Sequence, residues 1–157
     1  MIAINPYKDI DQFFVDSYFN MFRDYALYGG KLITYPHIWN LASRAFYQLF
    51  DNESKQAICI SGESGAGKSY GTRLCMRFIT GLFKDIDGPA KEGEISIEDK
   101  IMNCNVILEA FGNSKTVMNN DSSRFGKYFI LQVDKADKHI KGAEIKSYLL
   151  EKSRVNS

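Results

Sequence analysis

The feature that most constrains this chain is a glycine-rich run, "GESGAGKS", at residues 62–69. It fits the pattern G-x-x-x-x-G-K-S/T, whose glycines let the backbone curl so that successive N–H groups point at phosphate oxygens. The short apolar run "QAICI" at 56–60 precedes it and predicts a buried strand. Apolar residues recur at helical spacing after it and predict a helix over residues 68–83. A strand, a glycine loop and a helix in this order predict a phosphate site at the positive N-terminal end of the helix.

The residue types within the loop indicate how it would bind a nucleotide. Lys68 is expected to reach the β- and γ-phosphates, and the Ser69 hydroxyl is expected to bind Mg²⁺. The backbone around the phosphates is expected to come from the six residues before Lys68, which are Gly62, Glu63, Ser64, Gly65, Ala66 and Gly67. The alternative is a glycine-rich turn that matches the pattern by accident, and the flanking strand and helix favour phosphate binding over it.

The rest of the chain predicts further helices and strands. Gly, Pro and mixed charges mark residues 84–94 as an exposed loop, and the helix after it is expected to begin at Ser96 and end at Gly112. These elements predict an α/β fold with a mixed β-sheet. The other expected elements are a helix over 36–50 and strands over 127–133 and 143–150, which flank the turn 134–142 as a hairpin. The apolar faces of the two later helices are expected at Leu74, Phe78 and Leu82, and at Ile97, Ile101, Leu108 and Phe111.

Composition narrows the class of protein. The chain has 157 residues, the size of one domain, and its 45% hydrophobic and 25% charged residues are typical of a folded globular protein. The formal net charge of +1 gives no strong field for nucleic acid, and no apolar run approaches the roughly 20 residues needed to span a membrane. The start, "MIAINPYKDI", lacks the basic leader and apolar core of a signal peptide. The three cysteines have no C-x-x-C spacing, and His37 and His139 lie far apart, so we expect reduced thiols and no metal site built on these histidines.

A second polar run, "NNDSSRFGKY" at residues 119–128, has side chains that can act on a bound phosphate chain. Ser122, Ser123 and Arg124 follow a flexible polar stretch, and such a segment can close on a γ-phosphate and a second magnesium position. The alternative is an ordinary polar loop that enters a strand, which would be the better interpretation without the glycine loop upstream.

Together the two runs resemble the nucleotide-binding part of a myosin motor domain, and the resemblance covers almost the whole chain. The glycine loop is close to the family's GESGAGKT, and residues 119–127 are close to its first switch, N-x-N-S-S-R-F-G-K. Kinesins also have an S-S-R switch, but theirs continues into Ser-His, whereas Arg124 here is followed by Phe-Gly-Lys. Six segments match the family in order and spacing: "AINPYKDI", "PHIWNLASRAF", "ESKQAICISGESGAGKS", "ILEAFGNSKTV", "NNDSSRFGKYF" and "IKSYLLEKSRV".

The resemblance implies a role for each residue of the switch. Asn119 would lie beside the phosphates, and Ser122 would lie near the γ-phosphate and the attacking water. Ser123 would supply a second hydroxyl to Mg²⁺, opposite Ser69. Arg124 would pair with a glutamate of the family's second switch, which closes the site before hydrolysis.

The resemblance also implies an adenine site and shows where this sequence departs from the family. Asn5, Pro6 and Lys8 match the start of the loop that lines the adenine. Because the departures concern base contacts and charge, they bear on affinity more than on phosphate binding itself. They are Asp11 in place of a proline, Phe13 in place of a tyrosine, Tyr70 in place of a glutamate, and Asp121 in place of the middle asparagine of the switch.

The implied function is that of an actin-based cytoskeletal motor that couples Mg-ATP hydrolysis to movement on actin filaments. The implied fold is a P-loop NTPase-type mixed β-sheet flanked by helices, with residues 1–157 forming part of a motor domain. The implied partners are actin filaments, and light chains on a lever, both through regions outside these residues. The implied location is cytoplasmic, in association with the cytoskeleton, and the implied cofactors are ATP and Mg²⁺.

The family's second switch, D-x-x-G-F-E, has no good match in these residues. "DIDG" at 85–88 fits D-x-x-G but continues with Pro-Ala, and Asp134 ends an apolar strand but lies in the expected hairpin. We therefore expect a myosin-type ATPase in the intact protein and no turnover by the 157 residues alone, with truncation at both ends. The alternative is a truncated nucleotide-binding module without turnover. A generic P-loop kinase or nucleic-acid ATPase is less favoured, since no basic stripe with interleaved aromatics is present.

Overall fold

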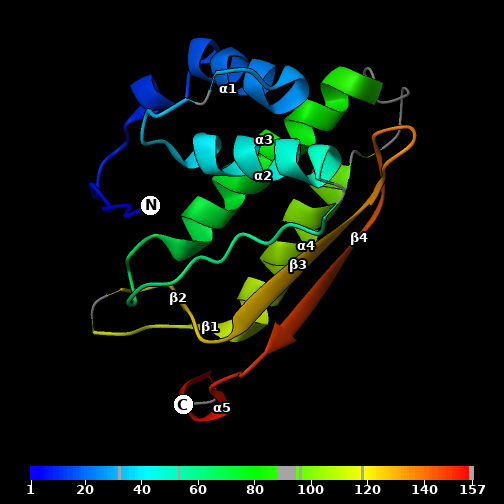
Figure 1. The fold of residues 1–157 in the computed structure, drawn as a ribbon. Coiled ribbons are helices and arrows are strands. Elements are labelled where there is room, and N and C mark those ends of the chain that lie inside the picture. Colours follow the sequence, from blue (N-terminus) through cyan, green and yellow to red (C-terminus); the bar gives the residue numbers. More distant parts are fainter. Residues whose placement is uncertain (32, 53, 88–94, 96, 118, 156–157) are drawn as a thin grey trace. The chain divides into compact units, whose positions relative to one another are not determined.

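The computed structural model describes the whole chain except residues 32, 53, 88–94, 96, 118 and 156–157 (Figure 1). The chain forms two compact units, the first made of residues 1–62 and 66–82 and the second of residues 63–65 and 83–157. None of the helices in the described ranges is long and apolar enough to cross a membrane.

The first unit is built from helices (Figure 1). A short 3-10 turn, η1 (Asp11–Phe13), leads into α1 (Asp16–Tyr28), which is followed by α2 (Ile38–Asp51) and α3 (Lys68–Asp87). The expected helices over 36–50 and 68–83 are confirmed, whereas α1 was not predicted as a separate helix. The core of this unit contains Phe22 and Ala26 from α1, Trp39, Ala42 and Phe46 from α2, and Leu74, Phe78 and Leu82 from α3.

His37 determines where α2 begins. Its Nδ1 accepts a hydrogen bond from the Trp39 backbone N–H at 3.1 Å, which caps the first turn of the helix. Its Nε2 lies 2.8 Å from the Phe13 carbonyl oxygen and must donate to it. The ring is therefore neutral and buried, stacked against Tyr18 and Phe22. Burial lowers the pKa of His37, and the hydrogen bond to Phe13 opposes this in part.

A buried hydrogen bond joins α2 to α3. The Trp39 indole N–H donates to the Leu74 carbonyl oxygen at 3.2 Å. The indole also packs against the ring of Phe78, with centroids 5.7 Å apart. The polar end and the apolar face of one side chain thus fix two helices to each other.

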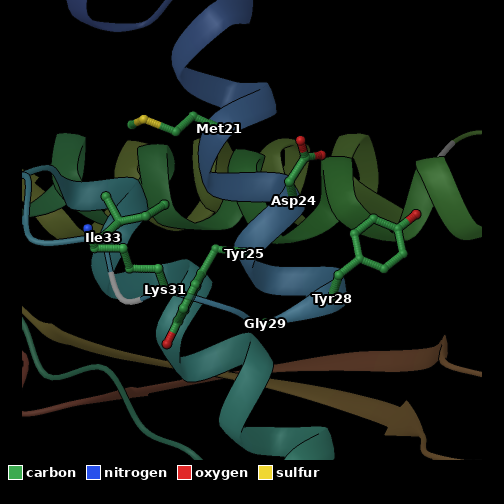
Figure 2. Close-up of a pocket in the computed structure, with 7 residues that line it drawn as sticks. All are labelled: Met21, Asp24, Tyr25, Tyr28, Gly29, Lys31 and Ile33. Atoms are coloured by element: carbon green, nitrogen blue, oxygen red, sulfur yellow. The ribbon is translucent and has the colours of Figure 1, made fainter.

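An open hollow of about 500 Å³ lies beside α1 in this unit (Figure 2). Tyrosine and aliphatic side chains form most of its wall, and none of its lining residues belongs to the expected nucleotide site. The lining consists of Met21, Asp24, Tyr25, Tyr28, Gly29, Lys31 and Ile33.

Among its described residues, the second unit contains the long helix α4, the short helix α5 and two small antiparallel sheets (Figure 1). The first sheet pairs Asn113 with Ser123 and Ser114 with Ser122. The second is a hairpin whose register runs from Gly126 opposite Tyr148 to Asp134 opposite His139, with an irregularity at Gln132 and Val133. In chain order the elements are α4 (Ile97–Gly112), β1 (Asn113–Ser114), β2 (Ser122–Ser123), β3 (Gly126–Asp134), β4 (His139–Tyr148) and α5 (Lys152–Val155).

The hairpin is confirmed, but its turn is shorter than predicted. The expected turn covered residues 134–142, whereas residues 139–142 belong to β4. The many charged residues in this stretch predicted a loop. In an antiparallel pair with one solvated face, however, charged side chains are compatible with a strand.

Three other expectations about the fold are wrong. Residues 56–60 form no strand, and Cys59 is exposed, because extended backbone becomes a strand only when another strand supplies hydrogen bonds and no described segment pairs with it. No mixed sheet is present among the described residues, which form antiparallel pairs only. The exposed loop begins later than Lys84, since α3 continues to Asp87; residues 88–94 of that loop lie outside the described residues.

The predicted apolar face of α4 is only partly buried. Ile101 is 5% exposed, but Phe111 is 78% exposed. The face that the structure buries runs instead through Ile101 and Asn105 toward Glu109, at spacings of four residues. Two of these side chains are polar because they bind a lysine of β3, as described below. Leu108 is half-buried, and the side chain of Ile97 lies outside the described residues.

Candidate functional site: a glycine loop and a serine-rich switch

The glycine-rich loop leads directly into α3, whose first residue is Lys68. Gly65 and Gly67 have φ angles of 80° and 87°, a region that residues with a Cβ rarely occupy. The Gly71 N–H donates to the Gly67 carbonyl oxygen at 2.8 Å and closes the first turn of the helix. The loop thus has the curled backbone that the sequence pattern predicts, at the N-terminal end of a helix of 20 residues.

Lys68 bends back over the loop. Its Nζ donates to the Gly62 carbonyl oxygen at 2.7 Å. The ammonium group therefore lies at the loop and not in open solvent beyond it. Ser69, the next residue, is exposed at the start of α3, as are Glu63 and Ala66 within the loop.

Asn5 lies against the same loop. A methyl group added at Gly67 would come within 3.9 Å of the Asn5 side chain. Asn5 is also held locally, since its Oδ1 accepts the Tyr7 N–H at 3.0 Å. Pro6 and Lys8, the other residues of the expected adenine segment, are exposed. The structure thus brings Asn5 to the loop from more than 60 positions away in the chain.

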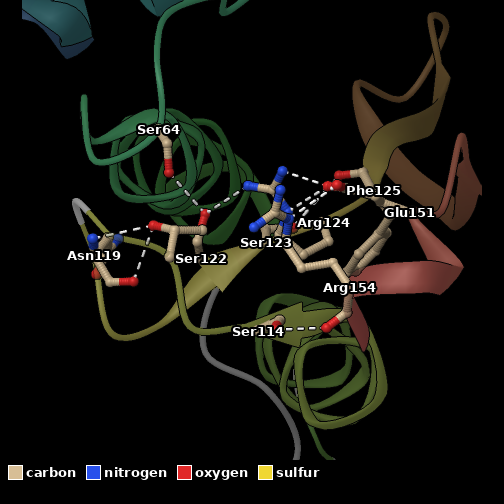
Figure 3. A network of polar contacts seen from close by, with 10 residues as sticks. Ser64, Ser114, Asn119, Ser122, Ser123, Arg124, Phe125, Glu151 and Arg154 are labelled. Atoms are coloured by element: carbon tan, nitrogen blue, oxygen red, sulfur yellow. Dashed lines mark hydrogen bonds and ion pairs between the residues drawn. The ribbon is translucent and has the colours of Figure 1, made fainter. Parts of the chain in front are cut away.

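Ser122 of β2 is the buried centre of the switch region, with 6% of its surface exposed. Its Oγ lies 2.9 Å from Ser64 Oγ, in the middle of the glycine loop, and 3.3 Å from Arg124 Nη1 (Figure 3). Ser123, the other serine of β2, turns its hydroxyl to the Phe125 carbonyl oxygen at 3.4 Å. The structure therefore brings Ser64 of the loop and Ser122 of the switch together in the second unit.

The start of the switch is fixed by a tight turn. Asn119 and Thr116 exchange backbone hydrogen bonds of 2.7 and 3.4 Å, and the Thr116 hydroxyl lies 3.1 Å from the Asn119 carbonyl oxygen. Asn119 Oδ1 accepts the Asp121 N–H at 3.2 Å. Asp121 Oδ1 in turn accepts from Asn113 Nδ2 at 2.8 Å, so this carboxylate is anchored to β1.

Arg124 has a carboxylate partner that sequence reasoning missed. Its Nε donates to Glu151 Oε2 at 2.8 Å, and its Nη2 contacts the same oxygen (Figure 3). The only partner expected for Arg124 was a glutamate of the family's second switch. Glu151 lies 27 residues further along the chain, in the segment "IKSYLLEKSRV", which resembles the family but for which no functional role was predicted from the sequence. The pKa of Glu151 is lowered, first by the hydrogen bond from Arg154 and next by that from Arg124.

Lys127 ties the end of the switch to α4. Its Nζ donates to Asn105 Oδ1 at 2.7 Å and to Glu109 Oε1 at 2.8 Å, and only 11% of the lysine side chain is exposed. The same ammonium lies 5.0 Å from the centre of the Phe125 ring. That ring packs on Gly112, where an added methyl group would come within 2.2 Å of it.

The two weak matches to a second switch have structural roles elsewhere. Asp85 lies within α3, and Gly88 of the same match lies outside the described residues. Asp134 ends β3, where Oδ2 contacts Lys141 Nζ at 2.6 Å and Oδ1 accepts the Ala136 N–H at 2.8 Å. These hydrogen bonds, that of Lys141 first, lower the pKa of Asp134 to about 2. Asp137 and His139 lie close to it, but both oxygens of Asp134 are already engaged within the hairpin.

The described residues form helices and small antiparallel sheets. A glycine-rich loop precedes α3, and the serine-rich segment contacts Ser64 within the second unit. A family model described as "Myosin head (motor domain)" matches residues 1–157. The chain therefore belongs to the myosin head family.

Individual relatives agree with this assignment. The chain is 41% identical to Myosin-8 of Arabidopsis thaliana over 155 residues, which cover 99% of this chain and 10% of that protein. It is 37% identical to Myosin-51 of Schizosaccharomyces pombe, over 100% of this chain and 10% of that protein. It is 37% identical to the Myosin-M heavy chain of Dictyostelium discoideum, over 99% of this chain and 9% of that protein. The chain thus spans about a tenth of the length of the curated relatives it matches.

Proposed function

We propose that residues 62–69 bind the phosphate chain of Mg-ATP, as the nucleotide-binding part of an actin-based motor. The observation that carries the proposal is the 2.9 Å contact between the hydroxyls of Ser64 and Ser122. It joins the loop that would hold the phosphates to the segment that would sense the γ-phosphate. A glycine turn matched by accident has no reason to meet a serine that lies 58 residues away.

The loop fits a phosphate chain on its own geometry. Gly65 and Gly67 have the positive φ angles that such a loop requires, and the loop leads into the N-terminal end of α3, where backbone N–H groups without helical partners favour an anion. Lys68 already lies over the loop, bonded to the neutral Gly62 carbonyl. A phosphate oxygen offers this ammonium a charged acceptor, which makes a stronger hydrogen bond.

Ser69 and Ser123 are the residues we assign to Mg²⁺. A hydroxyl oxygen is a hard ligand of the kind that Mg²⁺ accepts, and the ion usually keeps several waters besides one or two protein ligands. When bound, the ion neutralises charge on the β- and γ-phosphates. Ser69 is exposed, and within the described part of the chain the Ser123 hydroxyl makes a long hydrogen bond of 3.4 Å, so both can exchange their present surroundings for a ligand.

The remaining roles follow from family membership. Ser122 lies near the γ-phosphate and the attacking water, and Asn119 lies beside the phosphates. Arg124 pairs with a glutamate of the family's second switch and so closes the site before hydrolysis. Asn5, Pro6 and Lys8 contact the adenine side of the nucleotide. In phosphoryl transfer the protein contributes positioning and charge stabilisation and forms no covalent bond, so these side chains orient and neutralise the phosphates without reacting themselves.

At the level of the whole protein we propose a P-loop NTPase-type fold, actin filaments and light chains as partners, and association with the cytoskeleton in the cytoplasm. A whole protein that does not co-sediment with actin filaments would contradict the motor assignment.

The magnesium dependence of binding tests the site itself. A fluorescent ATP analogue is titrated into the chain with Mg²⁺ and again with EDTA. Ser69→Ala is expected to remove most of the difference between the two titrations, and Ser147→Ala, at an exposed serine of β4, is expected to keep it. Equal Mg²⁺ dependence in both variants would contradict the assignment of Ser69.

A further inference from the structure

We propose that Glu151 is a positioning residue for the γ-phosphate-sensing side chains, because it holds Arg124 and, through Arg124, Ser122. The inference rests on the proposed function of the switch and names a residue of that site outside residues 119–127. Glu151 lies between β4 and α5, three residues beyond the end of β4.

The first step is the geometry of the guanidinium. Two of its nitrogens, Nε and Nη2, contact a single oxygen of Glu151, and the third, Nη1, donates to Ser122 Oγ at 3.3 Å. Because the guanidinium is planar and rigid, fixing two nitrogens sets the direction of the third. Glu151 therefore decides where Nη1 points.

The backbone supports the same pair. The Glu151 N–H donates to the Arg124 carbonyl oxygen at 2.9 Å, and the Arg124 N–H donates to the Gly112 carbonyl oxygen, also at 2.9 Å. Side chain and main chain thus hold the two residues in one relative position. The side chains of Arg124 and Glu151 are 21% and 35% exposed, so solvent reaches them only partly.

The second oxygen of Glu151 is held as well. Oε1 accepts from Arg154 Nε at 2.9 Å, and the Arg154 carbonyl oxygen accepts from Ser114 Oγ at 2.9 Å (Figure 3). One carboxylate therefore bridges two arginines, and Arg154 connects it back to β1. A glutamine of the same shape presents one acceptor and one donor group, so it cannot serve both arginines in this way.

The consequence concerns the hydroxyl of Ser122. Arg124 has no acceptor, so Ser122 Oγ must accept the hydrogen bond from Nη1. That leaves the hydroxyl hydrogen of Ser122 for an acceptor, such as Ser64 Oγ or a phosphate oxygen. Glu151, by directing Arg124, keeps buried Ser122 oriented as a donor toward the region where the γ-phosphate is expected.

The test compares ATP with ADP, since only ATP has the γ-phosphate. Affinities of the full 157-residue chain for fluorescent Mg-ATP and Mg-ADP analogues are measured for the unchanged chain, Glu151→Gln and Glu144→Gln. Glu144, which contacts Lys146 on exposed β4, is the matched control. Glu151→Gln is expected to weaken Mg-ATP binding on the order of tenfold, the scale of one lost charge-assisted hydrogen bond, and to leave Mg-ADP binding nearly unchanged.

A second measurement needs no nucleotide. The Arg124 Nε–H is expected to be protected from solvent exchange by NMR in the unchanged chain and in Glu144→Gln, and to lose protection in Glu151→Gln. Equal weakening of ATP and ADP binding, or unchanged protection in Glu151→Gln, would overturn the inference and leave the phosphate loop intact as a proposal. An unchanged chain that binds neither nucleotide would overturn the proposed function, and this inference with it.

Discussion

The ammonium of Lys127 lies 2.8 Å from the carboxylate of Glu109 and connects β3 to α4 at the end of the switch. Lys127→Met keeps the apolar stem and leaves Glu109 and Asn105 without this donor. We expect a loss of about 2–3 kcal/mol in the free energy of unfolding, since removing one member of a largely buried pair exposes the desolvation penalty of the other. Urea unfolding followed by circular dichroism measures it, with Lys146→Met as the exposed control. If Lys127→Met and Lys146→Met unfold at the same urea concentration, the Lys127–Glu109 pair adds nothing to stability.

Gly112 is expected to resist substitution because the Phe125 ring occupies the space of a side chain there. An added methyl group would lie 2.2 Å from that ring, so Gly112→Ala must displace Phe125 at a cost of about 1–3 kcal/mol. Gly142→Ala is the control, since its nearest neighbour would be 3.6 Å away. Thermal melting of the two variants distinguishes them. A melting temperature for Gly112→Ala at or above that of Gly142→Ala would contradict the packing described here.

Asp121 is expected to weaken nucleotide binding through its charge. Asp121→Asn keeps an oxygen that can accept from Asn113 and removes the negative charge, so Mg-ATP is expected to bind a few-fold more tightly at low ionic strength. The gain should shrink as salt is added, and Asp137→Asn in the exposed hairpin turn should give none. A titration at low salt that does not distinguish Asp121→Asn from the unchanged chain would show that the carboxylate has no effect on the nucleotide.

His37 is expected to make the stability of the first unit depend on pH. Its pKa in the folded chain lies below the ordinary value of 6.5, chiefly because the ring is buried. Above pH 6.5 the ring is neutral in both states and the full stability is present. As pH falls below 6.5 the unfolded chain takes up a proton that the folded chain resists, so stability is lost at up to about 1.4 kcal/mol per pH unit.

The variant His37→Asn tests this pH dependence. Asparagine is a good helix N-cap and does not titrate, so the decline between pH 6.5 and the folded pKa should flatten, whereas His139→Asn should retain it. Urea unfolding over a pH series measures both variants. A decline of the same slope in His37→Asn would assign the pH dependence to other groups.

Much of the helical structure could be predicted because its determinants are local. Leu74, Phe78 and Leu82 recur at helical spacing, and all three are buried on α3. The hairpin was also predictable, since two strand-like runs lie on either side of a polar turn. The extended conformation of residues 56–60 without a strand partner was not predictable. A strand depends on a partner, and the apolar composition of a segment does not reveal whether one is present. Phe111 is a similar case. Its spacing fits the apolar face of a helix, but it is exposed, because whether another element packs on that face depends on the tertiary structure.

The candidate site also contains residues that the sequence predicts and residues that only the structure reveals. The loop at 62–69 is recognisable because the phosphate binding proposed for it requires glycines and a lysine at fixed spacing. Glu151 carries no such mark, since it meets Arg124 only after the hairpin has brought residues 27 positions apart together. Nothing in the sequence indicated the role of His37 either. Both of its ring nitrogens bond to backbone groups, and such contacts leave no residue pattern that can be recognised in a sequence.

The most direct test of the account is an equilibrium titration of Mg-ATP, by calorimetry, into the unchanged chain, Lys68→Ala and Lys84→Ala. Lys84 lies in the last turn of the same helix and serves as the matched control. We predict that Lys68→Ala weakens binding on the order of tenfold or more, the effect of one charged hydrogen bond to a phosphate, and that Lys84→Ala binds as the unchanged chain does. Superimposable titration curves for all three proteins would contradict the assignment of the glycine loop as the nucleotide site.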